Sequence, residues 1–177
     1  MSRLAELSHH RWTLPVLAEI ERTKGSRFAT LTGKLGVSGE SLRRTLGWLV
    51  EAGVVTRNPG YGHPLRPEYV FTRHGARLGP KARRLVEALR GHEEIGLKKW
   101  SLPVLAELDQ PRRFSELRAA LPDATPRALT LALKDLRAAG LVTRTVQDDY
   151  PPSVVYETTP AGRRIGAAAQ ALRATKT

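Results

Sequence analysis

The chain contains the same pattern twice. Residues 11–20 read RWTLPVLAEI, and residues 99–108 read KWSLPVLAEL. An offset of 87 positions then relates further pairs up to the end of each copy: Gly53 with Gly140, Tyr69 with Tyr156, Thr72 with Thr159, and Gly75 with Gly162. This period is longer than those of solenoid repeats. Each copy is therefore expected to be a small domain with its own core rather than one turn of an array.

The composition indicates a globular chain without thiol chemistry. Its 177 residues are 41% hydrophobic, and no apolar run approaches the roughly 18–20 residues of a membrane span. The first residues lack the apolar segment of a secretory signal, so a cytoplasmic protein without membrane partners is expected. The absence of cysteine excludes disulfides, zinc ribbons and thiol nucleophiles.

The charge favours an acidic partner. Lys and Arg number 29 against 17 Asp and Glu, which gives a net charge of +12 and favours nucleic acid. Residues 1–90 hold 16 basic and 7 acidic side chains, whereas residues 91–177 hold 13 and 10. The first copy is therefore expected to dominate the attraction of phosphate.

The order of elements in the second copy predicts a winged helix. Apolar spacing predicts a helix from about residue 94 to 109 and a short helix over 113–121. Thr125 and Pro126 are a strong helix start, leading to a third helix that ends at Gly140. Strands over 141–146 and 153–158 form a hairpin, and a last helix runs from Thr159 towards residue 175. Three helices, a hairpin and a helix are typical of a winged helix-turn-helix.

Specific residues carry a resemblance to a known family. The second copy has Lys99 with Trp100, residues 113–117 (RFSEL), residues 139–144 (AGLVTR) and residues 150–152 (YPP). The first copy is more divergent but keeps Arg11 with Trp12, residues 53–57 (GVVTR) and Tyr69 with Thr72 and Gly75. In this order and spacing, found twice, the chain resembles the HxlR family of winged helix-turn-helix transcriptional regulators.

The resemblance implies a fold and a function. HxlR-like proteins are typically single winged-helix domains that dimerise and bind operator DNA as repressors or activators. This chain is expected to be mainly α with small β-hairpin wings (α+β), as tandem winged-helix domains in an intramolecular pseudo-dimer. The expected domains are residues 1–79 and 95–177, joined by a helical connector over 80–94. The family pattern often includes a cysteine before the first helix, which some members use to sense electrophiles or oxidants, and this chain has no cysteine. The sequence leaves open whether the protein is a monomer that forms a pseudo-dimer within one chain or a homodimer of two such chains.

The expected function is sequence-specific binding of double-stranded DNA, with both recognition helices in the major groove of an imperfect palindrome. The candidate DNA contacts are residues at the start or on the outer face of the third helix of each copy. They are Ser38, Gly39, Glu40, Ser41, Arg43, Arg44, Thr125, Arg127, Thr130 and Lys134. The alternative for the arginines is that they only solubilise an exposed helix face. In the first wing, Arg57, His63 and Arg66 are expected to reach phosphate or the minor groove. The second wing carries Asp148 and Asp149, which repel phosphate.

Other functions are less supported by the sequence. Trp12, Trp48 and Trp100 could line a pocket for a small-molecule effector, although core positions are the simpler interpretation. A drug-sequestering protein on a winged-helix scaffold is therefore the alternative function. The histidines at 9, 10 and 92 lack a metal-binding motif, so no metal or cofactor is expected. Catalytic motifs such as GxSxG and GxxxxGK[ST] are absent, and no enzyme activity is expected.

Overall fold

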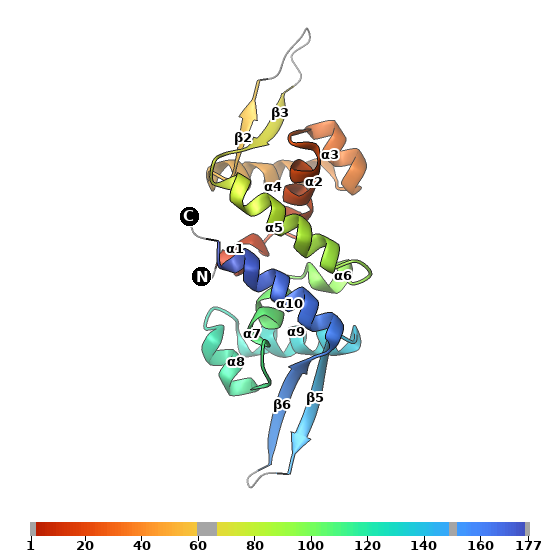
Figure 1. The fold of residues 1–177 in the computed structure, drawn as a ribbon, viewed down its shortest axis with the longest axis vertical. Coiled ribbons are helices and arrows are strands. Elements are labelled where there is room, and N and C mark those ends of the chain that lie inside the picture. The colour runs from red at the N-terminus through yellow and green to blue at the C-terminus, as the bar shows by residue number, and fades with distance from the viewer. Residues whose placement is uncertain (1–2, 60–66, 149–151, 176–177) are drawn as a thin grey trace. The chain divides into compact units, whose positions relative to one another are not determined.

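Three helices precede the hairpin in the first copy. The computed structural model describes residues 3–59, 67–148 and 152–175. Helices α2 (Thr13–Thr23), α3 (Phe28–Leu35) and α4 (Gly39–Glu51) are followed by strands β2 (Val55–Asn58) and β3 (Glu68–Phe71) and by helix α5 (Gly75–Ala88). Figure 1 shows the hairpin extending from the helices of its own unit. A short strand β1 (Ser26–Arg27) pairs antiparallel with β3, so the sheet order is β1-β3-β2.

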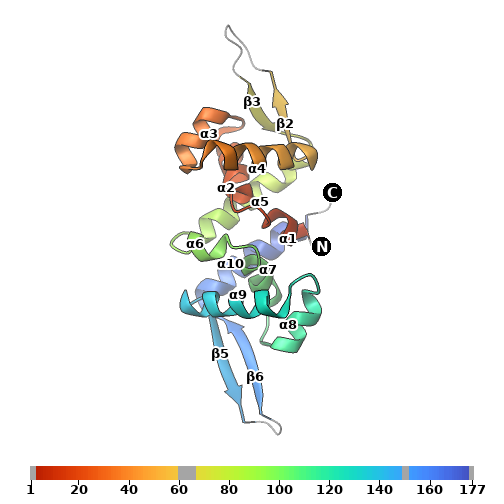
Figure 2. The same cartoon turned by 180° about the vertical axis from the view of Figure 1, so that it is seen from behind.

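The second copy repeats this order. It contains α6 (Glu93–Gly96), α7 (Ser101–Glu107), β4 (Arg112–Arg113), α8 (Phe114–Ala120) and α9 (Pro126–Ala138). Strands β5 (Val142–Gln147) and β6 (Ser153–Thr158) then form the wing, and α10 (Pro160–Arg173) closes the copy (Figure 2). Its sheet has the matching order β4-β6-β5. The structure therefore confirms the mixed α+β class and the two winged-helix copies.

Leucines on one face of each third helix build the cores. In α9, Leu129, Leu133 and Leu136 are at most 2% exposed, as their helical spacing predicts. In α4, Leu42, Leu46 and Leu49 are equally buried. Each third helix is thus held by its apolar face, and its opposite face is left to solvent.

The helix at the start of the chain belongs to the core of the second copy. Helix α1 (Arg3–Leu7) packs against α7 and α10, with Leu4, Ala5 and Leu7 at most 2% exposed. Accordingly, one compact unit combines the described residues up to His9 with Ala88–Ala174, and the other contains the described part of His10–Glu87 with Thr175. The predicted connector over 80–94 corresponds to the second half of α5, a turn and the start of α6.

One local prediction was wrong. The single helix predicted over 94–109 is broken into α6 and α7, and Pro103 lies in the first turn of α7, where its missing N–H costs no hydrogen bond within the helix. Pro103 is the third residue of α7, and Pro15 is the third residue of α2. The short helix predicted over 113–121 is confirmed as α8, and Arg113 just before it pairs with Val155 in the short strand β4. Two-residue strands carry too little periodicity to be predicted from sequence.

Candidate nucleic-acid interface

A helix-turn-helix is present in each copy, formed by α3 with α4 and by α8 with α9. Both third helices begin at a side-chain cap. The Ser38 hydroxyl accepts a hydrogen bond from Ser41 N at 3.2 Å, and the Thr125 hydroxyl accepts one from Ala128 N at 3.2 Å. Such caps satisfy a backbone donor that the first helical turn leaves without a partner. The predicted contact residues Ser38 and Thr125 therefore have a structural role at equivalent positions.

The outer face of α4 carries two arginines. Arg43 and Arg44 are exposed, one turn into the helix. The Arg43 guanidinium lies over the Phe28 ring of α3, 5.6 Å from its centroid, and Arg44 lies 3.7 Å from the Glu40 carboxylate. Phe28 therefore restrains Arg43, because a guanidinium over an aromatic face is attracted by the ring. An ion pair as exposed as that of Arg44 and Glu40 contributes little to stability, so Arg44 keeps its freedom to bind elsewhere.

The start of α4 has smaller side chains. Gly39 and Ser41 are half-buried, and the Ser41 hydroxyl accepts a hydrogen bond from the Ser38 hydroxyl at 3.0 Å. The Ser41 side chain is therefore engaged with the helix cap itself.

The outer face of α9 has different chemistry. Arg127, Thr130 and Lys134 are exposed there, as predicted. The Thr130 hydroxyl donates to the carbonyl of Pro126 at 2.9 Å, so it is engaged with its own helix. Leu131, 56% exposed, stands where the 87-residue offset places Arg44 in the first copy. The two third helices thus present the same backbone frame with unlike side chains.

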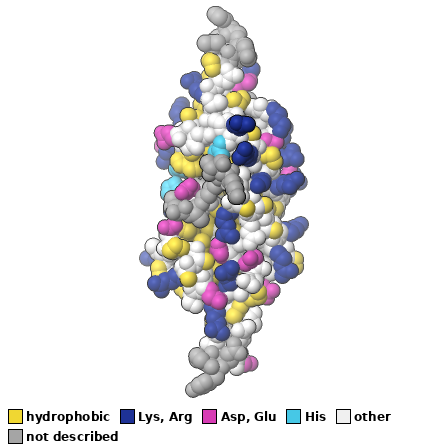
Figure 3. Space-filling model, turned by 60° about the vertical axis from the view of Figure 1, so that its left-hand side comes forward, with side chains coloured by type: hydrophobic (Ala, Val, Ile, Leu, Met, Phe, Trp, Pro, Cys, Tyr) yellow, Lys and Arg dark blue, Asp and Glu magenta, His cyan; other side chains and the backbone are white. Residues whose placement is uncertain are grey.

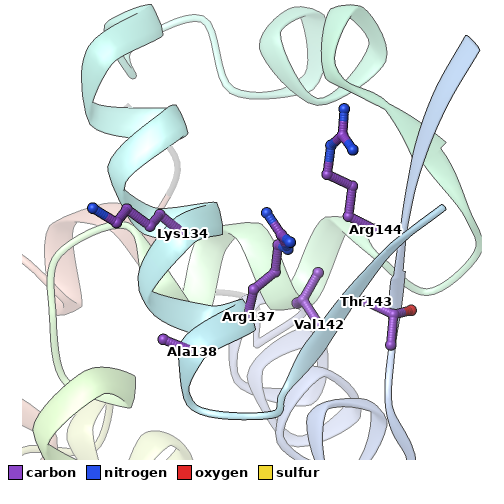
Figure 4. Close-up of a pocket in the computed structure, with 6 residues that line it drawn as sticks. All are labelled: Lys134, Arg137, Ala138, Val142, Thr143 and Arg144. Carbon is purple, nitrogen blue, oxygen red and sulfur yellow. The ribbon is translucent and has the colours of Figure 1, made fainter. Parts of the chain in front are cut away.

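A basic groove lies between α9 and β5 in the second copy. It encloses about 510 Å³ and is lined by Lys134, Arg137, Ala138, Val142, Thr143 and Arg144. Figure 4 shows Arg137 projecting from α9 on the side where Arg144 rises from β5, whereas Lys134 points away from them. Arg137 and Arg144 were not selected from the sequence. Arg144 could have been found from the sequence, because the 87-residue offset matches it to Arg57, which was selected.

The first wing is described only in part. Arg57 is exposed on β2, where it is paired with Tyr69 of β3. His63 and Arg66 lie outside the described residues, as does Asp149 of the second wing. Asp148 is exposed just after β5. The roles expected for His63 and Arg66 therefore stay predictions.

The tryptophans are half-buried rather than core residues. Trp12 and Trp48 belong to one unit and Trp100 to the other. The rings of His10 and Trp48 are 6.0 Å apart, and the Lys99 ammonium lies 5.4 Å from the centre of the Trp100 ring. Trp100 also borders a mostly apolar hollow of about 200 Å³, together with Leu131 and Ala128 of α9.

Basic and acidic side chains are mixed on one face of the molecule. Figure 3 shows Lys and Arg side chains spread over one face with acidic side chains among them. Away from the third helices, the pKa of Glu19 is lowered because Arg22 donates hydrogen bonds to its carboxylate at 2.7 and 2.9 Å.

Among the described residues, no group of three or more His, Asp or Glu side chains could hold a metal ion. In the same part of the chain, no helix is long and apolar enough to cross a membrane.

The family comparison matches both copies. The model of the HxlR-like helix-turn-helix family matches residues 7–94 and again residues 95–176. The chain belongs to the HxlR-like helix-turn-helix family. The double match agrees with the internal repeat of the sequence and with the two helix-turn-helix units of the structure.

Related proteins bear the names of regulators. The chain is 43% identical over 68 residues to an uncharacterised HTH-type transcriptional regulator of Synechocystis sp., covering 38% of this chain and 50% of the relative. It is 41% identical over 73 residues to one of Methanothermobacter thermautotrophicus, covering 41% and 55%. The chain thus spans about half the length of these curated relatives. Family and relatives are regulators, not enzymes.

A solved structure is also similar. The reduced form of the transcriptional regulator YodB from B. subtilis is 28% identical, with 49% of this chain and 85% of that chain covered and a TM-score of 0.43.

Proposed function

We propose that this HxlR-like chain is a transcriptional regulator that binds double-stranded DNA sequence-specifically through both third helices, α4 and α9. The observation that carries the proposal is the repeated helix-turn-helix with a capped third helix whose outer face is exposed and basic. In helix-turn-helix proteins the second helix of the motif enters the major groove with its N-terminal residues at the base edges. Arg43, Arg44 and Arg127 are the side chains expected to bind guanine edges or phosphate there.

The two halves of the bound site are expected to differ. At equivalent positions the first copy has Glu40, Arg43 and Arg44, and the second has Arg127, Thr130 and Leu131. Arginine suits the O6 and N7 acceptors of guanine, whereas the methyl groups of Thr130 and Leu131 suit the thymine methyl. Two such copies in one chain, acting as a pseudo-dimer, favour an imperfect palindrome whose half-sites are about one helical turn, ~10 bp, apart.

Selection of genomic fragments by the purified protein tests this function. At ~150 mM salt, where purely electrostatic binding is suppressed, one imperfect palindrome is expected to be enriched. The triple variant R43A/R44A/R127A is expected to lose the enrichment. The variant R77A/R84A/R164A removes the same charge from exposed positions on α5 and α10 and is expected to retain it. Salt-sensitive binding without sequence preference contradicts the proposal. Footprint length then separates one pseudo-dimer from a homodimer of chains.

A second function has one observation in its favour. The apolar hollow beside Trp100 adjoins Leu131 on α9, so a small molecule seated there would touch the helix proposed to read DNA. An effector that binds one state better shifts DNA affinity by its differential binding free energy. Small-molecule binding that survives R43A/R44A/R127A, combined with no enriched DNA sequence, favours the drug-sequestering alternative. Ligand-dependent loss of DNA binding favours an effector-responsive regulator.

A further inference from the structure

We propose that the groove between α9 and β5, the helix–wing groove, clamps the phosphate backbone of DNA, and that the described residues of the first copy form no equivalent clamp. The inference rests on the proposed function and deepens it, because it states which copy anchors the duplex. The groove combines two arginines from different elements, Arg137 of α9 and Arg144 of β5.

The lining of the groove is suited to an anion. Its charged side chains are Lys134, Arg137 and Arg144, and none of the described residues that line it carries a carboxylate. Both guanidinium groups belong to exposed residues. The Thr143 hydroxyl donates to the carbonyl of Glu157 at 3.3 Å, which ties this part of β5 to β6. Guanidinium groups bind phosphate oxygens through paired N–H donors, which makes Arg137 and Arg144 the expected phosphate ligands.

The position of the groove fits duplex DNA better than a free anion. Its walls are the last turn of α9 and the first residues of the wing strand β5. When the start of a recognition helix lies in the major groove, the helix end and wing lie over a sugar–phosphate backbone. A backbone phosphate is therefore the occupant that we assign.

Among the described residues of the first copy, the positions equivalent to the groove hold only one arginine. The 87-residue offset matches Arg137 to Val50 and Ala138 to Glu51, and it matches Arg144 to Arg57. Val50 is 41% exposed and Glu51 is exposed, so a phosphate there would meet one arginine beside a carboxylate. The larger positive charge of residues 1–90 does not replace a clamp, because charges farther than the Debye length of about 8 Å are largely screened at physiological salt.

Salt dependence of DNA binding tests the clamp by loss. Each phosphate contact contributes roughly 0.9 to the slope of log affinity against log salt, so R137Q/R144Q is expected to reduce the slope by about 2. The matched variant R90Q/R164Q removes the same charge from exposed positions of the same unit and is expected to leave the slope nearly unchanged. An equal reduction in both variants shows a general charge effect and overturns the inference.

A graft into the first copy tests the clamp by gain. V50R/E51A introduces an arginine at the position equivalent to Arg137 and removes the carboxylate, and V50A/E51A is its control. The graft is expected to steepen the salt slope by about 1 relative to its control, because one phosphate contact is added. A graft that matches its control contradicts the inference.

The outcomes separate the two proposals. If the wild-type protein enriches no DNA sequence yet R137Q/R144Q still reduces its salt slope, the proposed function fails and the clamp stands as a non-specific contact. If an enriched sequence is bound with the same slope by R137Q/R144Q, the function stands and the clamp fails.

Discussion

The hydroxyl of Thr159 donates a hydrogen bond of 2.8 Å to the carbonyl oxygen of Gly140. The same hydroxyl accepts a hydrogen bond from Gly162 N and so caps α10. In the first copy Thr72 makes the equivalent bonds, 2.6 Å to the carbonyl of Gly53 and 3.0 Å from Gly75 N. One side chain in each copy thus joins the turn after the third helix to the helix after the wing. This bond fixes where the wing leaves and rejoins the helices.

The substitution Thr159→Val is expected to lower the free energy of unfolding of its unit by about 1–2 kcal/mol, because it removes a helix cap and leaves the Gly140 carbonyl without this donor. Chemical denaturation measures the change. Thr145→Val, on the exposed face of β5, is the control and is expected to change stability by less than about 0.5 kcal/mol. Equal effects would show that the cap has no special role.

Gly162→Ala is expected to destabilise the protein by about 1–3 kcal/mol, since overpacking forces the backbone to shift. A Cβ at Gly162 would lie 2.0 Å from the carbonyl oxygen of Leu141. Gly33→Ala is the matched control: a Cβ there meets nothing within 4 Å, and the helical position should gain about 0.5–1 kcal/mol. Thermal unfolding of both variants gives the comparison, and a stabilised Gly162→Ala protein would contradict the described packing.

Leu4→Ala is expected to destabilise the unit that contains the second copy, by about 2–5 kcal/mol, because a fully buried leucine leaves a cavity. Hydrogen exchange should show the loss of protection in α7 and α10, against which α1 packs. Loss of protection confined to α2 and α4 would instead assign the first helix to the first copy.

The ion pair of Glu19 with Arg22 predicts a pH dependence. Because the folded protein lowers the pKa of Glu19, the pair stabilises the fold above the unfolded pKa of this carboxyl and ceases to do so as the pH falls through the folded pKa. Glu19→Gln is therefore expected to lower stability at pH 7 but to match the wild type in acid. A difference that is constant with pH would indicate packing rather than charge.

The unlike third helices predict separable effects on the two half-sites. Arg43→Ala and Arg127→Ala are each expected to cost about 1–3 kcal/mol of DNA binding and to relax base preference in a different half-site. Binding to a library randomised one position at a time measures this. If both variants relax the same position, the two copies do not read separate halves.

Much of the fold could be predicted from the sequence because it is set by local rules. Thr125 with Pro126 and Thr159 with Pro160 predicted two helix starts, and both threonines cap their helices. The spacing of Leu129, Leu133 and Leu136 predicted the buried face of α9 and therefore its exposed face. The repeat predicted that the first copy would follow the same plan.

The sequence by itself determined the two copies, the starts of α9 and α10, and the family, since capping and helical periodicity depend on neighbours within a few residues. The tertiary structure alone decided that α1 packs against α7 and α10, that β4 joins β6, and that Arg137 lies beside Arg144. Those relationships join residues from separate elements. They depend on which apolar faces are buried against each other. The periodicity of a single helix or strand shows which of its faces is apolar but not which other element covers that face.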